Sequence, residues 1–396
     1  MANVSSSNGL EKRPKLRFPG FDEQYKQCRI GDIYAERSQR GASDMELLSV
    51  TMNDGVKPRS EIEGKDNSSE DKSNYKIVRK GDMVYNSMRM WQGANGISPC
   101  DGIVSPAYTV LMPKQEINNG YFAALFKSTK LINEFRKNSQ GMTSDTWNLK
   151  YPQIETIKVQ IPSVSEQNIV SALFSVLDAR IVAQAQLVES LKKYKRGLLS
   201  QLIAQKKSFD TSGEWKTVKL GHIFKERTER AKGNETLLAV TISNGVQRRD
   251  EIDLKDNSSD DKSNYKCVYI GDIAYNTMRM WQGASGVSPY NGIVSPAYTI
   301  VTPIRPDLHN MTFWAYYFKY SPLVQTFQMF SQGLTSDTWN LKFPQFSEIT
   351  VTMPPISEQD KIAECLSVFD EHCKCEDEKL QALLQVRTSL LQQLFI

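Results

Sequence analysis

The chain contains one sequence written twice, and this duplication limits its fold more than any other feature. Residues 88–94 and 278–284 both read MRMWQGA. At an offset of 190, residues 66–111 match residues 256–301 at 33 of 46 positions. After two extra residues the offset becomes 192, and GMTSDTWNLKYPQ at 141–153 aligns with GLTSDTWNLKFPQ at 333–345. Because the repeat covers nearly the whole chain, we predict two domains with the same fold.

Each copy has the same order of expected elements. In the first copy, short alternating segments at 46–52, 75–88 and 102–113 are interrupted by Gly, Asn and Pro, which is typical of strands joined by turns. Residues 120–139 have helical spacing of apolar side chains, and IKVQIP at 157–162 resembles a closing strand. The pattern predicts a mixed α+β domain of about 150 residues.

A long helix is expected after each domain. Residues 165–205 and 357–396 carry leucines and aromatics at steps of three, four or seven, the spacing of a coiled coil. Forty residues make a helix of roughly 60 Å. We expect the two helices to pair antiparallel and so to relate the domains by a pseudo-two-fold axis; two unrelated helical tails are the alternative. The side chains predicted to pack between them are Leu187, Leu191, Leu198, Leu380, Leu384 and Leu391.

These patterns divide the chain into five parts. We predict a disordered tail at 1–16, a first repeated domain at 17–163, a first long helix at 164–206, a second repeated domain at 207–355 and a second long helix at 356–396.

Composition narrows the class of protein and its compartment. Hydrophobic residues make up 40% and charged residues 24% of the 396 residues, as in soluble globular proteins. The net charge of +4 permits a nucleic-acid partner only through a local basic surface. The polar start is unlike a secretion signal, and no run of eighteen apolar residues exists. We expect a cytoplasmic protein with reduced cysteines and no membrane contact.

The segments that resemble metal-binding or catalytic motifs are each incomplete. Cys365, His372, Cys373 and Cys375 cluster on an expected helix, but the first copy has no such residues, so we predict thiols and no metal. SPAY at 105–108 and 295–298 lacks the second proline of the amino-methyltransferase motif it resembles. EGK at 63–65 and DLK at 253–255 lack the leading aspartate of a nuclease, the three histidines have no repeated partners, and no phosphate-binding P-loop is present. We predict no catalytic residues and no cofactor in this chain.

The remaining duplicated residues suit DNA binding. Arginine can contact a guanine edge and glutamine an adenine edge, whereas lysine and small polar groups suit phosphates. The polar loops match between the copies as well as the apolar strands do, so we predict a role in binding beyond structure. The predicted DNA contacts are Lys72, Asn74, Tyr75, Arg89, Gln92, Ser144, Asp145 and Lys150, with Lys262, Asn264, Tyr265, Arg279, Gln282, Ser336, Asp337 and Lys342 in the second copy. Core packing is the alternative for the tryptophans of both motifs.

The ordered set of motifs resembles the specificity subunit of a type I restriction-modification enzyme. The resemblance covers essentially the whole chain and rests on the order domain, long helix, domain, long helix. It also rests on KLRFPGF at 15–21, GDI at 31–33 and 271–273, IPSVSEQ at 161–167 and MPPISEQ at 353–359, and LLSQLIAQ at 198–205 mirrored by LLQQLFI at 390–396.

The resemblance implies a non-catalytic DNA reader. Each domain would read one half of a bipartite site in double-stranded DNA, and the paired helices would set the gap and dock two modification subunits. Those partners would carry S-adenosylmethionine and methylate adenine N6, and a restriction subunit would supply ATP- and Mg-dependent translocation and cleavage.

One departure from the family and several alternatives remain. The family's two domains usually differ more than these, so we predict two nearly identical, inverted half-sites, with Arg79/Tyr269, Lys80/Ile270, Asn95/Ser285 and Asp101/Asn291 as candidates for a distinguished base. The alternatives are a specificity subunit of a type IIB-like system, a standalone methyltransferase or nuclease, and an interaction scaffold built on the helices.

Overall fold

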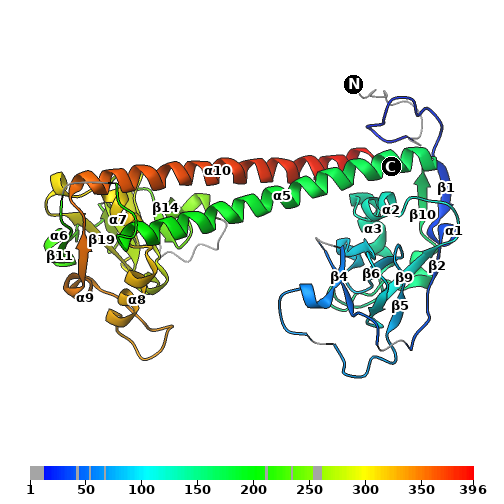
Figure 1. Cartoon of the computed structure of the whole chain (residues 1–396), viewed down its shortest axis with the longest axis horizontal. Helices are drawn as coiled ribbons and strands as arrows, with labels where there is room; N and C mark the ends of the chain where they lie inside the picture. Colours follow the sequence, from blue (N-terminus) through cyan, green and yellow to red (C-terminus); the bar gives the residue numbers. More distant parts are fainter. Residues whose placement is uncertain are drawn as a thin grey trace. The chain divides into compact units, whose positions relative to one another are not determined.

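The computed structural model describes residues 13–41, 44–52, 55–66, 68–209, 213–232, 235–252 and 261–396. The chain forms two compact units, one made of residues 1–185 with 378–396 and the other of residues 186–377. Each unit holds one copy of the repeat and parts of two long helices, α5 (Val164–Ile203) and α10 (Ile356–Gln393) (Figure 1). The predicted fold class, two repeated α+β domains with two long helices, is confirmed.

The first unit is built on an antiparallel four-stranded sheet in the order β2-β9-β6-β7, flanked by the strand pairs β1-β10, β3-β4 and β5-β8. Its strands are β1 (Lys26–Arg29), β2 (Tyr34–Glu36), β3 (Leu48–Thr51), β4 (Gly55–Pro58), β5 (Lys76–Val78), β6 (Met83–Asn86), β7 (Asn95–Ile97), β8 (Gly102–Val104), β9 (Tyr108–Pro113) and β10 (Lys158–Ile161). Its short helices are α1 (Ile30–Ile33), α2 (Asn119–Leu125), α3 (Thr129–Asn138) and α4 (Tyr151–Ile154).

The second unit repeats this topology, with the sheet order β12-β19-β16-β17 and the pairs β11-β20, β13-β14 and β15-β18. Its strands are β11 (Lys216–Lys219), β12 (Phe224–Glu226), β13 (Leu238–Thr241), β14 (Gly245–Arg248), β15 (Lys266–Val268), β16 (Ile273–Asn276), β17 (Ser285–Val287), β18 (Gly292–Val294), β19 (Tyr298–Pro303) and β20 (Thr350–Met353). Its short helices are α6 (Leu220–Ile223), α7 (Met311–Tyr317), α8 (Ser321–Phe330) and α9 (Phe343–Glu348).

The expected helix over 120–139 is two helices, α2 and α3. Ser128 interrupts it, because its backbone is extended (φ −67°, ψ 144°) and its hydroxyl accepts a hydrogen bond from the Leu131 amide at the start of α3. A serine in this position favours a new helix start over continuation of the preceding one. The helical spacing continues across the break, which is why the sequence pattern suggested a single helix.

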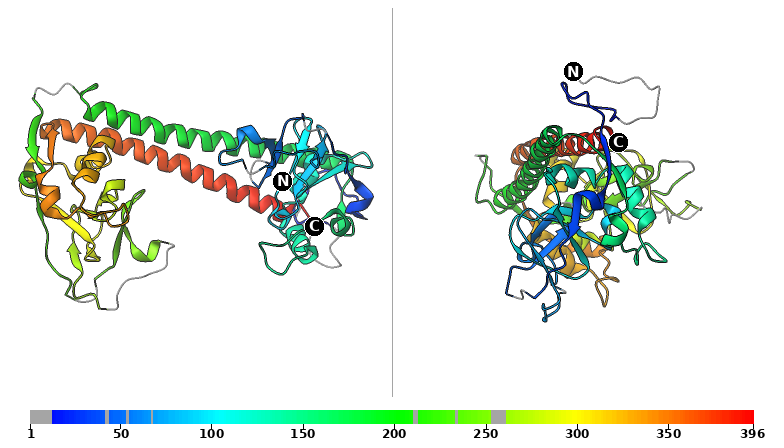
Figure 2. Two further views of the ribbon diagram at one scale, coloured as in Figure 1. Left: turned by 90° about the horizontal axis from the view of Figure 1, so that it is seen from below. Right: turned by 90° about the vertical axis from the view of Figure 1, so that its right-hand side faces the viewer.

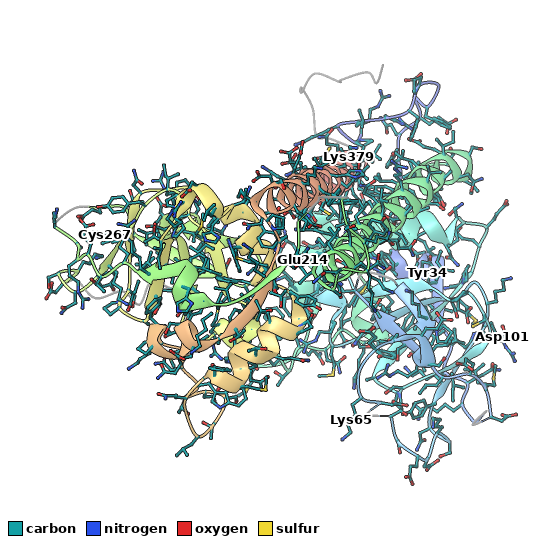
Figure 3. All side chains as sticks on the ribbon, turned by 60° about the vertical axis from the view of Figure 1, so that its left-hand side comes forward. Tyr34, Lys65, Asp101, Glu214, Cys267 and Lys379 are labelled. Carbon is teal, nitrogen blue, oxygen red and sulfur yellow. The ribbon has the colours of Figure 1, made fainter. Side chains whose placement is uncertain are left out.

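Aromatic side chains from helices and strands fill the core of the first unit. Tyr34 of β2, labelled in Figure 3, meets Phe122 of α2 edge to face at 5.5 Å between ring centroids. The end of the chain belongs to the same core, because Phe395 stacks on Phe174 at 5.9 Å and meets Tyr121 at 5.3 Å. The C-terminus therefore lies within the first unit (Figure 2).

The SEQ motif anchors each long helix to its domain. Glu166 is 1% exposed, and its carboxylate accepts two hydrogen bonds from Arg17 at 2.9 and 2.8 Å and one from the Tyr25 hydroxyl at 3.0 Å. The Gln167 side chain accepts from the Asn118 amide at 3.0 Å and donates to the Pro162 carbonyl at 3.1 Å. A buried carboxylate and a buried amide are retained here because their hydrogen bonds are satisfied.

The start of the second long helix is anchored in the same way. Gln359 accepts from the Asn310 amide and donates to the Pro354 carbonyl, both at 3.0 Å, and the Trp215 indole donates to Glu358 at 3.0 Å. The motif is therefore a structural feature that fixes where each helix leaves its domain.

Within each unit, α5 and α10 run antiparallel. In the first unit Phe174 contacts Phe395 and Asp178 pairs with Arg387 at 2.5 Å, so partners further along α5 lie earlier on α10. In the second unit Lys192 pairs with Asp377 at 3.8 Å and Lys195 pairs with Asp370, so the partner of the later α5 residue again lies earlier on α10. Both sets of contacts fit the predicted antiparallel pair.

Buried and half-buried positions follow a heptad on each helix, with steps of four and three. On α5 they are Val170, Phe174, Leu177, Ile181, Gln184, Val188, Leu191, Lys195, Leu198 and Leu202; on α10 they are Gln359, Ile362, Leu366, Phe369, Cys373, Glu376, Leu380, Leu383, Arg387, Leu390 and Leu394.

Four of the six leucines predicted to pack between the helices are at least partly buried: Leu191, Leu198, Leu380 and Leu391. The other two are exposed, Leu187 by 43% and Leu384 by 39%. They lie one residue away from the heptad, where Val188 and Leu383 take the inward positions.

Length and composition alone would allow α5 to cross a membrane, which is weak evidence because long packed helices pass the same test. Part of the predicted tail is attached to the first unit, since the Leu16 amide donates to the Gln393 carbonyl at 2.9 Å. Residues 1–12 of that tail lie outside the described residues.

Candidate nucleic-acid interface

The MRMWQGA stretch forms the turn between β6 and β7. Met90 is buried and begins the short 3-10 helix η2 (Met90–Gln92), and Gly93 ends it with φ 84°, a conformation that favours glycine. The Trp91 indole donates to the Met88 carbonyl at 3.1 Å, which fixes the ring over the turn. Arg89 and Gln92 are the polar side chains that this turn leaves exposed.

The second copy reproduces the turn between β16 and β17. The short helix η4 (Met280–Gln282) ends at Gly283 with φ 79°, and the Trp281 indole donates to the Met278 carbonyl at 3.1 Å. Arg279 and Gln282 are exposed as in the first copy. Identical sequence therefore gives the same presentation of one arginine and one glutamine in each domain.

The GMTSDTWNLK loop lies against this turn. The Trp147 ring meets that of Trp91 at 5.2 Å and 79° between planes, and the Leu149 amide donates to the Ser87 carbonyl at 2.8 Å. The tryptophans of the two motifs thus pack on each other, and the polar tip residues Ser144 and Asp145 remain exposed. The second copy repeats the contact between Trp281 and Trp339 at 5.2 Å, with Ser336 and Asp337 exposed.

The DKSNYK stretch forms a third turn, directly before β5. Lys76, the last residue of the stretch and the first of β5, donates to the Tyr108 carbonyl at 2.8 Å, and Tyr108 pairs with Asn86, the last residue of β6. This register brings the turn to the end of the sheet where the β6–β7 turn lies. The three predicted stretches therefore lie at one end of the domain.

The tyrosines of this third turn are not available for DNA contacts. Tyr75 and Tyr265 are each 5% exposed, and the Tyr75 hydroxyl accepts from the Ser69 amide at 3.0 Å. Both rings are buried below the turn, where they support the loop and do not face solvent. Asn74 and Asn264 are exposed, and Lys72 and Lys262 are half-buried.

Four side chains at this end have no partner within the described residues: those of Arg89, Gln92, Arg279 and Gln282 make no hydrogen bond or ion pair there. Lys150 and Lys342, at the end of the tryptophan loop, are exposed as well. The pKa of Asp71 in the third turn is lowered, chiefly because the carboxylate accepts the Ser73 amide at 2.8 Å. Exposed cations without internal partners are free to bind an anionic ligand such as DNA.

A lysine that was not among the predicted contacts lies behind each turn. Lys127 donates to the Met52 carbonyl at 3.3 Å, and Lys319 donates to the carbonyls of Ile242, at 3.1 Å, and of Gly283. These bonds tie the β3–β4 and β13–β14 hairpins to the same end of the domain. Burial lowers the pKa of Lys319 to about 8. The matched lysines at an offset of 192 are the only sequence signal that could have indicated them.

A second overlooked feature is a set of exposed apolar side chains at matched positions of the two copies. They are Met52, Met88 and Met142 in the first copy and Ile242, Met278 and Leu334 in the second. Exposed apolar groups that recur at one functional end of a domain indicate an interaction surface rather than chance exposure.

The residues that differ between the copies have distinct surroundings. Asn95 and Ser285 are fully buried and cannot reach DNA. Arg79 pairs with Asp101 at 2.7 Å, and Asp101 lies at the surface (Figure 3). In the second copy Tyr269 donates to Glu229 at 3.1 Å.

The surroundings of Lys80 and Ile270 match: their amides donate to Asp101 and Asn291 at 2.8 and 2.9 Å.

A further difference between the copies lies at the tryptophan pair. The Arg136 guanidinium is 6.0 Å from the Trp91 ring and 5.8 Å from the Trp147 ring, and Gln328 stands at the aligned position of the second copy.

The motifs set aside in the sequence have ordinary structural roles. Ala107, in SPAY, accepts the Ser87 amide at 3.2 Å in the turn that leads into β9. His372 pairs with Glu376 at 3.6 Å on α10, Cys373 is buried and Cys375 is exposed. Among the described residues no group of three or more His, Cys, Asp or Glu is placed to hold a metal ion. The DLK stretch at 253–255 lies outside the described residues.

Comparison with known proteins finds one family and several related folds. Residues 23–193 and 212–385 each match the type I restriction modification DNA specificity domain. The type I restriction-modification system S subunit from M. genitalium superimposes with a TM-score of 0.59 at 14% identity, over 97% of this chain and 99% of that one. A chain from a structure of complex assembly and conformational transition of the type I R-M system superimposes with a TM-score of 0.58 at 14% identity, over 96% and 98%.

Proposed function

Because the chain belongs to the family of type I restriction modification DNA specificity domains, we propose that each of its two domains reads one half of a split DNA site. The chain is the non-catalytic, DNA-recognising subunit of its system. The observation that carries the proposal is the repeated turn in which Arg89 and Gln92, or Arg279 and Gln282, are exposed and have no partner among the described residues. Arginine suits a guanine edge and glutamine an adenine edge in the major groove.

The other residues at this end of each domain support these two readers. Lys150 and Lys342 follow the tryptophan loop, and exposed lysines suit phosphates, which position a protein on DNA without specifying sequence. Ser144 and Asp145, with Ser336 and Asp337, are exposed on the loop tips and can contact base edges or the backbone. Tyr75 and Tyr265 support their loops from the core and are left out of the proposed contacts.

We propose that the two half-sites are nearly the same and inverted. The reading turns are identical in sequence and in their hydrogen bonds, so the same bases suit both. An inverted repeat is the site that the pseudo-two-fold relation expected from the sequence would require. The surfaces differ at Arg79, Arg136 and their counterparts, where one base pair can be distinguished.

The partners follow from the proposed role. Modification subunits bring S-adenosylmethionine and methylate adenine N6 on the DNA that this chain selects, and a restriction subunit brings ATP- and Mg-dependent cleavage. The paired helices dock the modification subunits, and the division into recognition domains at 17–163 and 207–355 with spacer helices at 164–206 and 356–396 describes the working parts. We expect the protein to act in the cytoplasm, where the DNA that it selects is found.

Methylation mapping tests the proposal. The full chain is expressed with its modification subunits in a host that lacks adenine methylation, and modified adenines are mapped by long-read sequencing. We expect one bipartite motif whose halves are inverted copies or differ at one position. Two unrelated half-sites would contradict the near-palindrome, and an absence of site-specific methylation would contradict the recognition role.

A further inference from the structure

The loop between α3 and α4, and its counterpart between α8 and α9, each carry an almost fully exposed apolar side chain. Met142 is 97% exposed and Leu334 is 100% exposed, and the two occupy the same place in the repeat. Burial of such a side chain stabilises a fold by about 1.5–3 kcal/mol, and a fully exposed side chain does not contribute this stabilisation. The side chain itself differs between the copies, but its size and apolar character are the same.

The loop holds this side chain on a firm support. Gln140 and Asn148 bridge across its base, and Thr143 and Thr146 bond to each other through backbone and hydroxyl groups at 2.9–3.1 Å. Gly141 has φ 139°, and a side chain there would come within 2.6 Å of the Thr146 carbonyl. The base of the loop is packed on the reading turn through Trp147, as described above.

Not every exposed apolar residue near this end has an apolar counterpart in the other copy. Met329 is 75% exposed at the end of α8, but its counterpart in the first copy is Lys137. Exposure of an apolar side chain is thus not retained at every position, whereas the apolar tip is retained, as are the less exposed pairs Met52/Ile242 and Met88/Met278. Met329 therefore serves as a matched control of the same residue type.

We propose that Met142 and Leu334 are wedges that enter the bound DNA between neighbouring base pairs, one in each half-site. The inference rests on the proposed recognition of DNA by these loops. Leucine and methionine are side chains that can part a base step, at a cost of a few kcal/mol that is offset by the closer fit of the bent duplex. Pyrimidine–purine steps part most easily, so the wedge adds a preference for TA or CA/TG at a step where no hydrogen bond reads the base.

The test measures unstacking directly in the complex of the full chain with its modification subunits. 2-Aminopurine, an adenine analogue that pairs with thymine, replaces in turn each adenine on either strand of the mapped site and its spacer, since its fluorescence rises when it is unstacked. The wild-type complex is compared with Met142→Ser, with Leu334→Ser, with the double variant and with Met329→Ser as control. Met142→Leu and Leu334→Met keep an apolar tip.

We expect an unstacked step in each half-site beyond the adenines that are methylated. Each serine variant removes the signal in one half-site, by at least fivefold, and leaves the other; the exchanged apolar variants and Met329→Ser retain both. Signals at the methylated adenines persist in all variants, which shows that recognition itself is intact. An unchanged unstacking pattern in the double variant would overturn the wedge.

A second set of duplexes separates the wedge from a contact with a thymine methyl group. If replacement of thymine by uracil near the step weakens wild-type binding as much as Leu334→Ser does, the side chain lies in the groove and the wedge is wrong. If the wild-type complex shows no site-specific binding at all, the proposed function fails instead.

Discussion

Removal of one reading arginine should damage one half-site and spare the fold. Arg89 is exposed and its side chain has no partner among the described residues, whereas its backbone helps to hold the turn through the Asn86 and Ala94 bonds at 2.9 and 3.3 Å. Arg89→Ala keeps both backbone bonds. We expect the free energy of unfolding to stay within about 0.5 kcal/mol of wild type, as for other surface changes.

The expected loss lies in binding to the cognate site. A bidentate contact between arginine and guanine discriminates by about 1–3 kcal/mol, which is roughly 5- to 150-fold in affinity. Arg279→Ala should cost the same, because the two turns are alike. The readers belong to separate units, so the double variant should lose about 2–6 kcal/mol, the sum of the single losses.

Fluorescence anisotropy at several salt concentrations can check this, with the complex of full chain and modification subunits on cognate and random duplexes. A base contact predicts a loss confined to cognate DNA with an unchanged salt slope. Lys158→Ala, which removes an exposed charge from β10, is the control and should leave cognate binding unchanged. Equal losses on cognate and random DNA, with a salt slope reduced by about one, would show a phosphate contact and refute the reading role.

Three further predictions concern stability. Gln167→Leu removes the hydrogen-bond partner of the Asn118 amide and of the Pro162 carbonyl. Each unpaired buried group costs about 1–3 kcal/mol, so the free energy of unfolding measured by urea titration should fall by about 2–6 kcal/mol. A loss below about 1 kcal/mol would mean that water replaces the side-chain amide. Phe395→Ala should cost the first unit about 3–5 kcal/mol in the same assay, because the ring is 7% exposed in that core; a near-neutral result would place the residues that follow α10 outside it. The third prediction is a pH dependence of Lys319, whose folded pKa of about 8 lies below its ordinary 10.5, so the unfolded chain binds more protons between these values and stability rises with pH. From pH 7.5 to 9.5 wild type should gain about 2 kcal/mol relative to Lys319→Met, and parallel stability curves for the two proteins would contradict the burial of a charged lysine.

The wedges and the arginines lie on different loops, so their roles can be tested separately. Arginine variants should lose affinity while the remaining contacts still part the base step at high protein concentration. Serine variants at the loop tips should lose the parted step while the arginines still select the site.

Much of the fold could be predicted from the sequence because it depends on local pattern and on duplication. Alternation and turn residues located most of the strands, and a matched copy confirmed which segments belong to one unit. The heptad in each long helix predicted a packed stripe, but two of the leucines chosen lie one residue away from it. Inward positions depend on the register of both helices at once, and Val188 takes the place expected for Leu187.

The duplicated sequence by itself determined two like domains, two long helices and a reading turn that is the same in each. Only the tertiary structure decided which residues of those turns face outward. Tyr75 lies inside because its ring fills space below the turn, whereas Arg89 stays outside because burial of an unpaired guanidinium would cost more than any packing it could gain. The approach of Trp147 to Trp91, which packs the loop that carries Met142 against the reading turn, results from contacts between segments more than fifty residues apart.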